Sequence, residues 1–167
     1  IALDENDPYK LFFTCGDKRS NYLCISDDKE ENIIQKPLPC SVHGNEVGRA
    51  TGDRLIYKNG RLYFGSQTAG IIYSEDMGES WQSIDLYGEK NISLIWTDSE
   101  GKLFIAGCSG EANSPDGVTR GHTLYCSTDG LKSFVPLTAP DPVKYENSSY
   151  YGFVPQRITS DSRYIYI

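Results

Sequence analysis

Short apolar segments of the strand type recur along this chain, and turn residues separate them. Four of them start with a basic residue and continue with three apolar or aromatic ones: Lys10–Phe13, Arg61–Phe64, Lys102–Ile105 and Arg163–Tyr166. A turn sequence precedes three of the four, and one of these turns, Asn59-Gly60, is typical of a two-residue hairpin of type I′. No window keeps a period of 3.6 residues, so the pattern predicts an all-β fold.

A second pattern follows the apolar run 70–73. Small or polar residues alternate with other residues before an aromatic one: Ser74, Asp76, Gly78, Ser80 and Trp81. The short Ser and Asp side chains can bond backbone N–H groups of a tight turn, and Gly78 supplies a positive φ. Trp81 is expected to fold back as an apolar plug between neighbouring strands. This spacing resembles the Asp-box, a turn repeated in the blades of sialidase-like β-propellers, and its predicted role is structural.

The same pattern occurs twice more, at intervals of about 50 residues. One copy keeps the Ser, Asp, Ser and aromatic positions as Ser127, Asp129, Ser133 and Phe134, but has Leu131 where Gly is expected. The other copy starts at Ser26 and keeps less of the pattern. Because such intervals with four short strands each are typical of propeller blades, the sequence predicts a single partial β-propeller over residues 1–167 with about three and a half antiparallel four-stranded blades. Their strands are expected near residues 9–35, 53–84, 92–137 and 156–167, the last blade being incomplete.

The two ends of such blades differ in what they carry. The first-to-second and third-to-fourth turns share one rim with the Asp-boxes, and we call it the hairpin rim. The second-to-third turns and the links between blades share the opposite rim, the loop rim. Four long segments fall on the loop rim: 36–52, 67–70, 107–121 and 138–156. Because long loops on a rigid scaffold are where binding usually resides, the loop rim is the predicted functional face.

Two of these segments carry candidate substrate-binding residues. The first contributes three residues able to hydrogen-bond a polar ligand: Asn45, Glu46 and Arg49. The second contributes three aromatic rings interleaved with amides and hydroxyls: Tyr150, Tyr151 and Phe153. Aromatic rings in such surroundings are typical of platforms on which sugars stack. A Gly-rich crossover whose charges pair with one another, and tyrosines that cover a blade edge, would give the same two patterns.

Composition narrows the choice of partners. The formal charge of −7 argues against nucleic acid and anionic membranes, which select basic surfaces, and suits a neutral ligand. No apolar run approaches the length of a membrane span. All five cysteines lack metal-ligand spacing and are expected to be small buried apolar residues: Cys15, Cys24, Cys40, Cys108 and Cys126. We therefore predict no metal and no cofactor, and the odd number of cysteines favours a reducing or anaerobic setting.

The chain also resembles glycoside hydrolase family 74, xyloglucan-cleaving glucanases built from two seven-bladed propellers. The matching segments are Gly44–Glu46, Gly48–Leu55 and Leu62–Ser66, then the Asp-box at Ser74, and later Gly152–Gln156. The resemblance implies a fragment of an extracellular, inverting hydrolase of β-1,4-glucan or xyloglucan-type polysaccharide. It also implies that the remaining blades belong to the same parent chain. The family's two catalytic aspartates come from outside this stretch, so no catalytic residue and no hydrolysis are expected of this chain alone.

Other interpretations stay open. Four positions depart from the family pattern and leave room for a different glycan or for a lineage without activity: Val47, Thr51, Asp53 and Gln156. A sialidase also carries Asp-boxes and binds its acidic sugar with three arginines, for which this chain has four candidates: Arg49, Arg54, Arg120 and Arg157. The Arg-Ile-Pro opening of sialidases is absent from this chain. A non-catalytic propeller that only binds its ligand would equally explain the lack of an obvious catalytic carboxylate.

Overall fold

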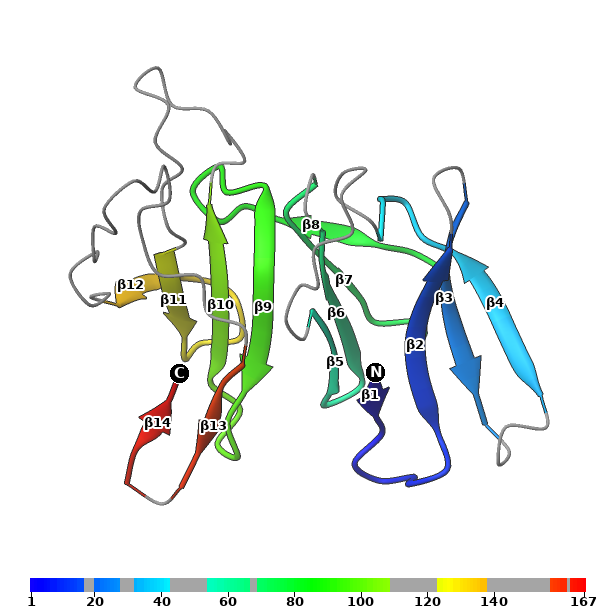
Figure 1. Cartoon of the computed structure of the whole chain (residues 1–167), viewed down its shortest axis with the longest axis horizontal. Helices are drawn as coiled ribbons and strands as arrows, with labels where there is room; N and C mark the ends of the chain where they lie inside the picture. Colours follow the sequence, from blue (N-terminus) through cyan, green and yellow to red (C-terminus); the bar gives the residue numbers. More distant parts are fainter. Residues whose placement is uncertain are drawn as a thin grey trace, which may run out of the picture.

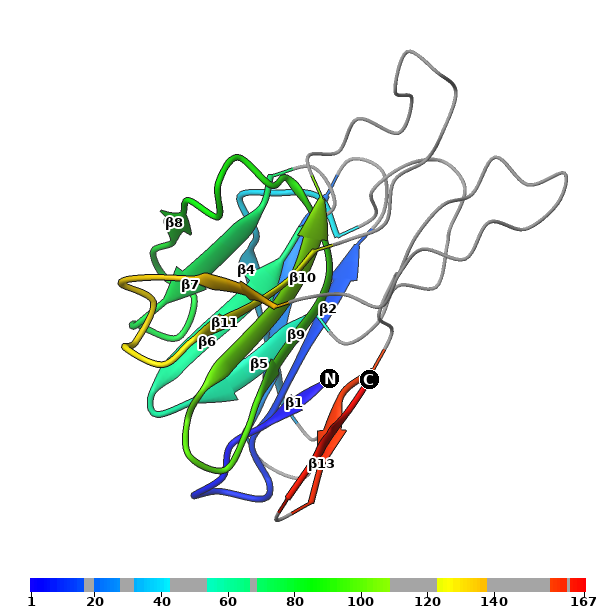
Figure 2. The same cartoon turned by 90° about the vertical axis from the view of Figure 1, so that its left-hand side faces the viewer.

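A computed structural model describes residues 1–16, 20–27, 32–42, 54–66, 69–108, 123–137, 157–161 and 163–167. Within these ranges every regular element is a strand, and the strands form antiparallel sheets (Figure 1). Figure 2, turned by 90°, shows the sheets one behind another. The predicted all-β fold is therefore confirmed.

Three sheets have four strands each, and strands that are neighbours in space are neighbours in sequence. Blade 1 contains β1 (Ala2–Leu3), β2 (Leu11–Gly16), β3 (Asn21–Ser26) and β4 (Ile33–Pro37). Blade 2 contains β5 (Leu55–Lys58), β6 (Arg61–Gly65), β7 (Ile71–Ser74) and β8 (Gln82–Ile84). Blade 3 contains β9 (Asn91–Thr97), β10 (Leu103–Cys108), β11 (Thr123–Ser127) and β12 (Val135–Leu137). A two-stranded hairpin of β13 (Thr159–Ser160) and β14 (Ile165–Tyr166) follows as blade 4.

The first strands of blades 1, 2 and 3 lie beside one another in order. β1 packs beside β5, and β5 packs beside β9. β1 starts blade 1 at Ala2, ahead of the region near residue 9 where its strands were expected. A strand of two residues is too short to produce a period-2 pattern, so it was not predictable from the sequence. β1 is thus the fourth strand of the sheet that forms blade 1.

Turn geometry separates the two rims of the described blades. Because consecutive strands are antiparallel, the β5–β6 and β7–β8 turns leave blade 2 at the hairpin rim and the β6–β7 connection leaves it at the loop rim. Asn59 and Gly60 in the β5–β6 turn have φ values of 51° and 79°, as a type I′ turn requires. The same alternation applies to blades 1 and 3.

The hydrophobic core consists of layers between adjacent blades. Along β6, the fully buried side chains of Leu62 and Phe64 pack in a cluster shared with blade 1. Tyr63 lies between them in sequence and packs in the cluster shared with blade 3. A third layer joins blade 3 to Ile158 of blade 4. Each such large apolar side chain contributes roughly 1.5–3 kcal/mol by leaving water, so the stacking of blades is a major source of stability.

Blades 2 and 3 approach each other closely over one isoleucine. A Cβ atom at Gly65, the last residue of β6, would lie 2.5 Å from Cγ2 of Ile92. A Cβ atom at Gly107, beside the β-bulge of β10, would lie 2.8 Å from Cδ1 of the same residue. A side chain at Gly65 would therefore force blades 2 and 3 apart, and a side chain at Gly107 would push β10 away from β9 within blade 3.

Candidate functional site

The Asp-box of blade 2 (Ser74–Trp81) is a closed set of hydrogen bonds. The Ser74 hydroxyl accepts the Gly78 N–H at 2.7 Å and donates its own proton to Asp76 Oδ1 at 2.8 Å. The Asp76 carboxylate also accepts the N–H and the hydroxyl of Ser80, at 2.9 and 2.5 Å. These hydrogen bonds, led by the one from the Ser80 hydroxyl, lower the pKa of Asp76 to about 2.

The Asp-box of blade 3 (Ser127–Phe134) repeats this arrangement. The Leu131 N–H donates to the Ser127 hydroxyl at 3.1 Å, and the Ser127 hydroxyl donates to Asp129 at 3.0 Å. Ser133 donates its N–H and its hydroxyl to Asp129, at 3.0 and 2.5 Å, and these bonds lower the pKa of Asp129 to about 2. Both Asp-box carboxylates are thus engaged in their own turns, an arrangement that suits a structural role.

Each Asp-box contains two consecutive residues in the left-handed region. In blade 2 these are Met77 and Gly78, with φ values of 56° and 83°. In blade 3 they are Gly130 and Leu131, with φ values of 70° and 79°. The glycine has therefore moved by one position between the two copies. Leu131 adopts a conformation that costs a residue with a Cβ roughly 1–2 kcal/mol, because the turn bonds hold its backbone there.

The aromatic residue that ends each Asp-box packs toward the preceding blade. Trp81 packs against the cluster between blades 1 and 2, and Phe134 is buried in the cluster between blades 2 and 3. The two residues therefore occupy equivalent places. Polar contacts reinforce both: Lys36 of blade 1 donates to the Met77 carbonyl at 2.8 Å, and the Tyr87 hydroxyl donates to the Phe134 carbonyl at 2.8 Å. Each Asp-box thus joins its blade to the one before it.

The six candidate substrate-binding residues lie outside the described ranges: Asn45, Glu46, Arg49, Tyr150, Tyr151 and Phe153. Both ends of the segment that carries the first three are described. The Arg54 guanidinium donates to the Val42 carbonyl at 2.9 Å, and the Val42 N–H donates to Asn21 Oδ1 at 2.9 Å. The two ends of segment 43–53 are therefore tied to each other and to blade 1 at the loop rim.

Arg54 is well placed to hold this segment. Its guanidinium carbon lies 5.8 Å from the centre of the Phe64 ring, and its carbonyl accepts the Gly65 N–H at 2.9 Å. Burial lowers the pKa of Arg54, which nevertheless stays charged at neutral pH. Its Nη1 is buried and has no hydrogen-bond partner among the described residues. The sequence marked Arg54 as a family-motif and arginine-triad candidate but gave no sign of its bond to a backbone carbonyl.

A second buried polar group lies in the link between blades 2 and 3. The Tyr125 hydroxyl donates to Glu89 Oε1 at 2.9 Å, and burial together with this bond raises the pKa of Tyr125 to about 12. Glu89 Oε2 is buried without a hydrogen-bond partner in the described part of the chain. A Cβ placed on Gly107 would lie 3.5 Å from Glu89 Cβ, so Glu89 stands where β10 reaches the loop rim. No motif or spacing in the sequence marks this carboxylate as a candidate.

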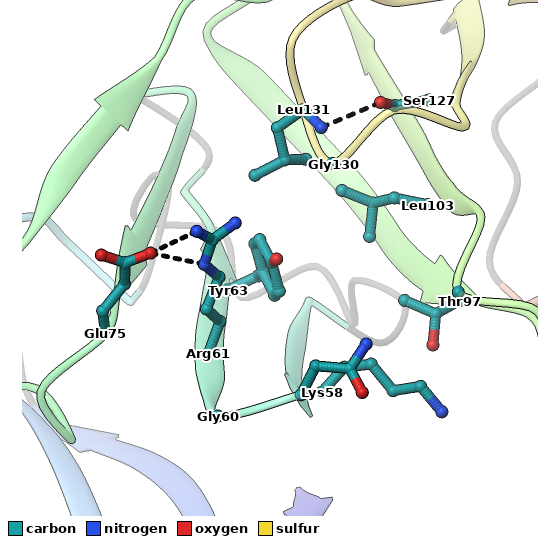
Figure 3. A pocket seen from close by; sticks show the side chains of 12 residues that line it. Lys58, Gly60, Arg61, Tyr63, Glu75, Thr97, Leu103, Ser127, Gly130 and Leu131 are labelled. Atoms are coloured by element: carbon teal, nitrogen blue, oxygen red, sulfur yellow. Dashed lines mark hydrogen bonds and ion pairs between the residues drawn. The ribbon is translucent and has the colours of Figure 1, made fainter.

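The cavity shown in Figure 3 lies on the opposite side, at the hairpin rim between blades 2 and 3. Its volume is about 430 Å³. Glu75 is the one carboxylate among its described lining residues, and it accepts a hydrogen bond from Arg61 Nε at 2.6 Å. Acid–base cleavage of a glycosidic bond needs two carboxyl groups, so this cavity lacks that machinery.

Other chemistry is limited in the described ranges. There, no group of three His, Cys, Asp or Glu side chains is placed to hold a metal ion. No helix in the same ranges has the length and apolar character needed to cross a bilayer.

Four-stranded antiparallel blades stacked side by side, with Asp-box turns at one rim, define a β-propeller fold. A solved structure agrees with this assignment. The GH74 xyloglucanase from Xanthomonas campestris matches 94% of this chain and 24% of its own, with a TM-score of 0.65 and 22% sequence identity. At that identity the likeness establishes the fold.

No family model matches the chain, but curated proteins do. An oligoxyloglucan-reducing end-specific xyloglucanase of Emericella nidulans is 29% identical over 118 residues, covering 63% of this chain and 15% of that protein. A probable enzyme of the same kind from Neosartorya fischeri is 24% identical over 161 residues, covering 89% and 18%. A Paenibacillus xyloglucanase is 25% identical over 154 residues, covering 78% and 15%. The chain thus spans less than a fifth of these relatives, and its expected resemblance to xyloglucan-cleaving glycoside hydrolases is confirmed.

Proposed function

We propose that this chain is part of a glycoside hydrolase that cleaves a xyloglucan-type polysaccharide, and that it forms one section of the substrate cleft. The observation that carries the proposal is the sequence similarity to xyloglucanases, which extends over as much as 89% of this chain. The formal charge of −7 agrees with a neutral polysaccharide as ligand. A polymeric substrate of this kind also implies an extracellular location.

The catalytic carboxyl pair would come from other blades of the parent protein. In an inverting glycosidase one carboxylic acid protonates the leaving oxygen and a carboxylate activates water, with the two groups about 6.5–9.5 Å apart. Among the described acids, Asp76 and Asp129 are engaged in their Asp-boxes and Glu75 is paired with Arg61. Two more described acids lie in the link between blades 2 and 3, where Asp85 accepts the Gly88 N–H and Glu89 accepts the Tyr125 hydroxyl.

This chain would contribute sugar subsites on the loop rim. Three polar side chains would bond sugar hydroxyls: Asn45, Glu46 and Arg49. Three aromatic rings would stack on pyranose faces: Tyr150, Tyr151 and Phe153. The hydrogen bond between Arg54 and Val42 supports this assignment, because it fixes both ends of the segment that carries the polar set.

Exposed apolar residues support further blades as the partners of this chain. Leu3 and Ile33 of blade 1 are 56% and 52% exposed, and Ile165 and Tyr166 of blade 4 are 42% and 50% exposed. Such residues lie at both ends of the stack of sheets. In a closed propeller the neighbouring blades would cover them.

The arginine triad of a sialidase finds less support. Arg54 is held by the Val42 carbonyl and the Phe64 ring, so it is not free to bind a sugar carboxylate. Arg157 is exposed at the start of blade 4. The similarity to xyloglucanases therefore supports a neutral glucan as the ligand more than an acidic sugar.

The proposal can be tested on the 167-residue chain itself. Binding of xyloglucan oligosaccharides should be measurable by calorimetry, and no reducing ends should be released. Replacing Tyr150 or Tyr151 by Ala should weaken binding by about 3- to 10-fold each, the loss expected for one stacking contact. Tyr9→Ala is a matched control, because Tyr9 is an exposed tyrosine at the hairpin rim.

Two results would contradict the proposal. Hydrolysis of xyloglucan by this chain alone would show that a catalytic pair is present within it. Equal losses of affinity in Tyr150→Ala and Tyr9→Ala would show that the sugar does not bind at the predicted platform.

A further inference from the structure

Two cysteines face each other on the central strands of blade 1. In the β2–β3 register, Cys24 is opposite Phe13 and Cys15 is opposite Tyr22, so the two cysteines are diagonal neighbours on one face of the sheet. The right-handed twist of antiparallel strands shortens one of the two diagonals. Their Sγ atoms lie 2.6 Å apart.

This separation is too short for two independent thiols. Non-bonded heavy atoms are in optimal contact at about 3.5–4.0 Å, whereas bonded sulfurs in a disulfide are about 2.0 Å apart. The Cys15–Cys24 contact therefore lies closer to a bond than to ordinary packing. The two sulfurs would need to approach by about 0.6 Å to reach bonding distance.

Two other described cysteines are in different surroundings. Cys40 packs against the cluster between blades 1 and 2, and Cys126 packs against the cluster between blades 3 and 4. Neither has a sulfur contact like that of Cys15 and Cys24. Among the cysteine side chains that the structure describes, Cys15 and Cys24 are therefore the pair close enough to form a bond.

We propose that Cys15 and Cys24 form a disulfide bond across β2 and β3, with a low-molecular-weight disulfide such as oxidised glutathione as the oxidant. The Cys15 thiolate, on the more exposed of the two residues, attacks one glutathione sulfur and releases the first glutathione thiolate. Cys24, which is 1% exposed, then loses its proton and attacks the Cys15 sulfur, releasing the second. Two protein thiols are oxidised, and one glutathione disulfide is reduced to two thiols.

The different burial of Cys15 and Cys24 agrees with this order of attack. Burial and the contact with Cys15 raise the pKa of Cys24 to about 12, so this thiol is a poor nucleophile until the mixed disulfide lies beside it. Cys15 is only partly buried, which leaves it accessible to the oxidant. The order of attack therefore follows from exposure.

The bond would brace the strand end that carries the candidate binding segment. Cys15 is one residue from Gly16, whose partner across the ladder is Asn21. The Asn21 side chain accepts the N–H of Val42, the residue before segment 43–53. The cross-link would therefore fix the part of blade 1 to which that segment is attached.

Trypsin digestion provides the direct test. Cleavage at Lys10, Lys18, Arg19 and Lys29 yields peptides 11–18 and 20–29, each with one cysteine. The 167-residue chain is incubated with oxidised glutathione, alkylated with iodoacetamide and digested without reductant. We expect peptides 11–18 and 20–29 to appear as one linked species, which dithiothreitol separates.

Matched variants control the assignment. Cys15→Ser should abolish the linked species, and Cys40→Ser should leave it unchanged. Separate, fully alkylated peptides 11–18 and 20–29 after oxidation would overturn the proposal. Links from Cys15 or Cys24 to other cysteines at equal yield would also overturn it.

Thermal unfolding tests the bracing role separately. Closing so short a loop should raise Tm by about 5–10 °C relative to the reduced chain. This rise should vanish in Cys15→Ser and persist in Cys40→Ser. A linked chain with an unchanged Tm would show that the bond forms without bracing the strands.

Discussion

Replacing Gly78 by Ala tests whether the Asp-box of blade 2 locks that blade onto blade 1. Gly78 has a φ of 83°, so any residue with a Cβ is strained there. The added Cβ would also lie 2.6 Å from Cδ2 of Leu23, on β3 of blade 1. Leu23 is fully buried, so its side chain has little room to retreat. The substitution therefore combines backbone strain with a clash between two blades.

The expected loss of stability follows from these two contributions. An Ala residue in the left-handed region costs roughly 1–2 kcal/mol. Overpacking of a tightly packed core costs typically about 1–3 kcal/mol. We therefore expect Gly78→Ala to lower the free energy of unfolding by about 2–5 kcal/mol.

Gly130 of blade 3 is the matched control. It lies one position earlier in the equivalent turn, with a φ of 70°, and an added Cβ would meet nothing within 4 Å. Gly130→Ala should therefore cost only the backbone strain, roughly 1–2 kcal/mol. The difference between the two variants isolates the contact between blades 1 and 2.

Urea unfolding followed by circular dichroism and tryptophan fluorescence would measure both variants. The midpoint should fall further for Gly78→Ala, with an unchanged dependence of the free energy on urea concentration. In a Leu23→Ala background the clash is removed, so Gly78→Ala should then cost no more than Gly130→Ala. Equal losses for the two glycine variants in the original background would refute the proposed contact.

Two further predictions concern the Asp-boxes and the loop rim. Since hydrogen bonds lower the folded pKa of Asp76 and Asp129 to about 2, below the ordinary 3.8, these carboxylates stabilise the fold above about pH 4, and this contribution is lost as the pH falls through about 2. The double Asn variant should show a flatter dependence of Tm on pH between these values, and an unchanged slope would contradict this. Arg54→Met should lower stability by about 1–3 kcal/mol and speed proteolysis within segment 43–53. Arg61→Met, which removes a surface ion pair, should cost about 1 kcal/mol or less and leave the cleavage rate unchanged.

The sequence predicted those features that depend on residues close together in the chain. The hairpin at Asn59-Gly60 and the two Asp-box turns arise from contacts within a few residues, so spacing alone is informative. The place of the glycine within the turn was not predictable. In blade 3, Leu131 adopts the positive φ expected of glycine, and so does its neighbour Gly130. The turn needs two consecutive residues in the left-handed region. Glycine is the second of them in blade 2 and the first of them in blade 3.

Features that depend on strand register and on distant backbone groups were not predictable from the sequence. The contact between Cys15 and Cys24 follows from the twist of two strands, and their separation in sequence does not signal it. Arg54 bonds a carbonyl, which any residue could supply. The six candidate substrate-binding residues lie outside the described ranges, so their roles remain predictions.

The position of the Asp-box plug also explains the exposed edge of blade 1. Trp81 and Phe134 each end an Asp-box and pack toward the preceding blade, and Ile33 occupies the same position in the copy that starts at Ser26. Phe134 is 7% exposed, whereas Ile33 is 52% exposed, because no described blade lies on that side. Packing in a propeller thus runs in one direction, with each blade inserting its plug into the one before it. A blade from the parent protein that covered Ile33 would complete this order.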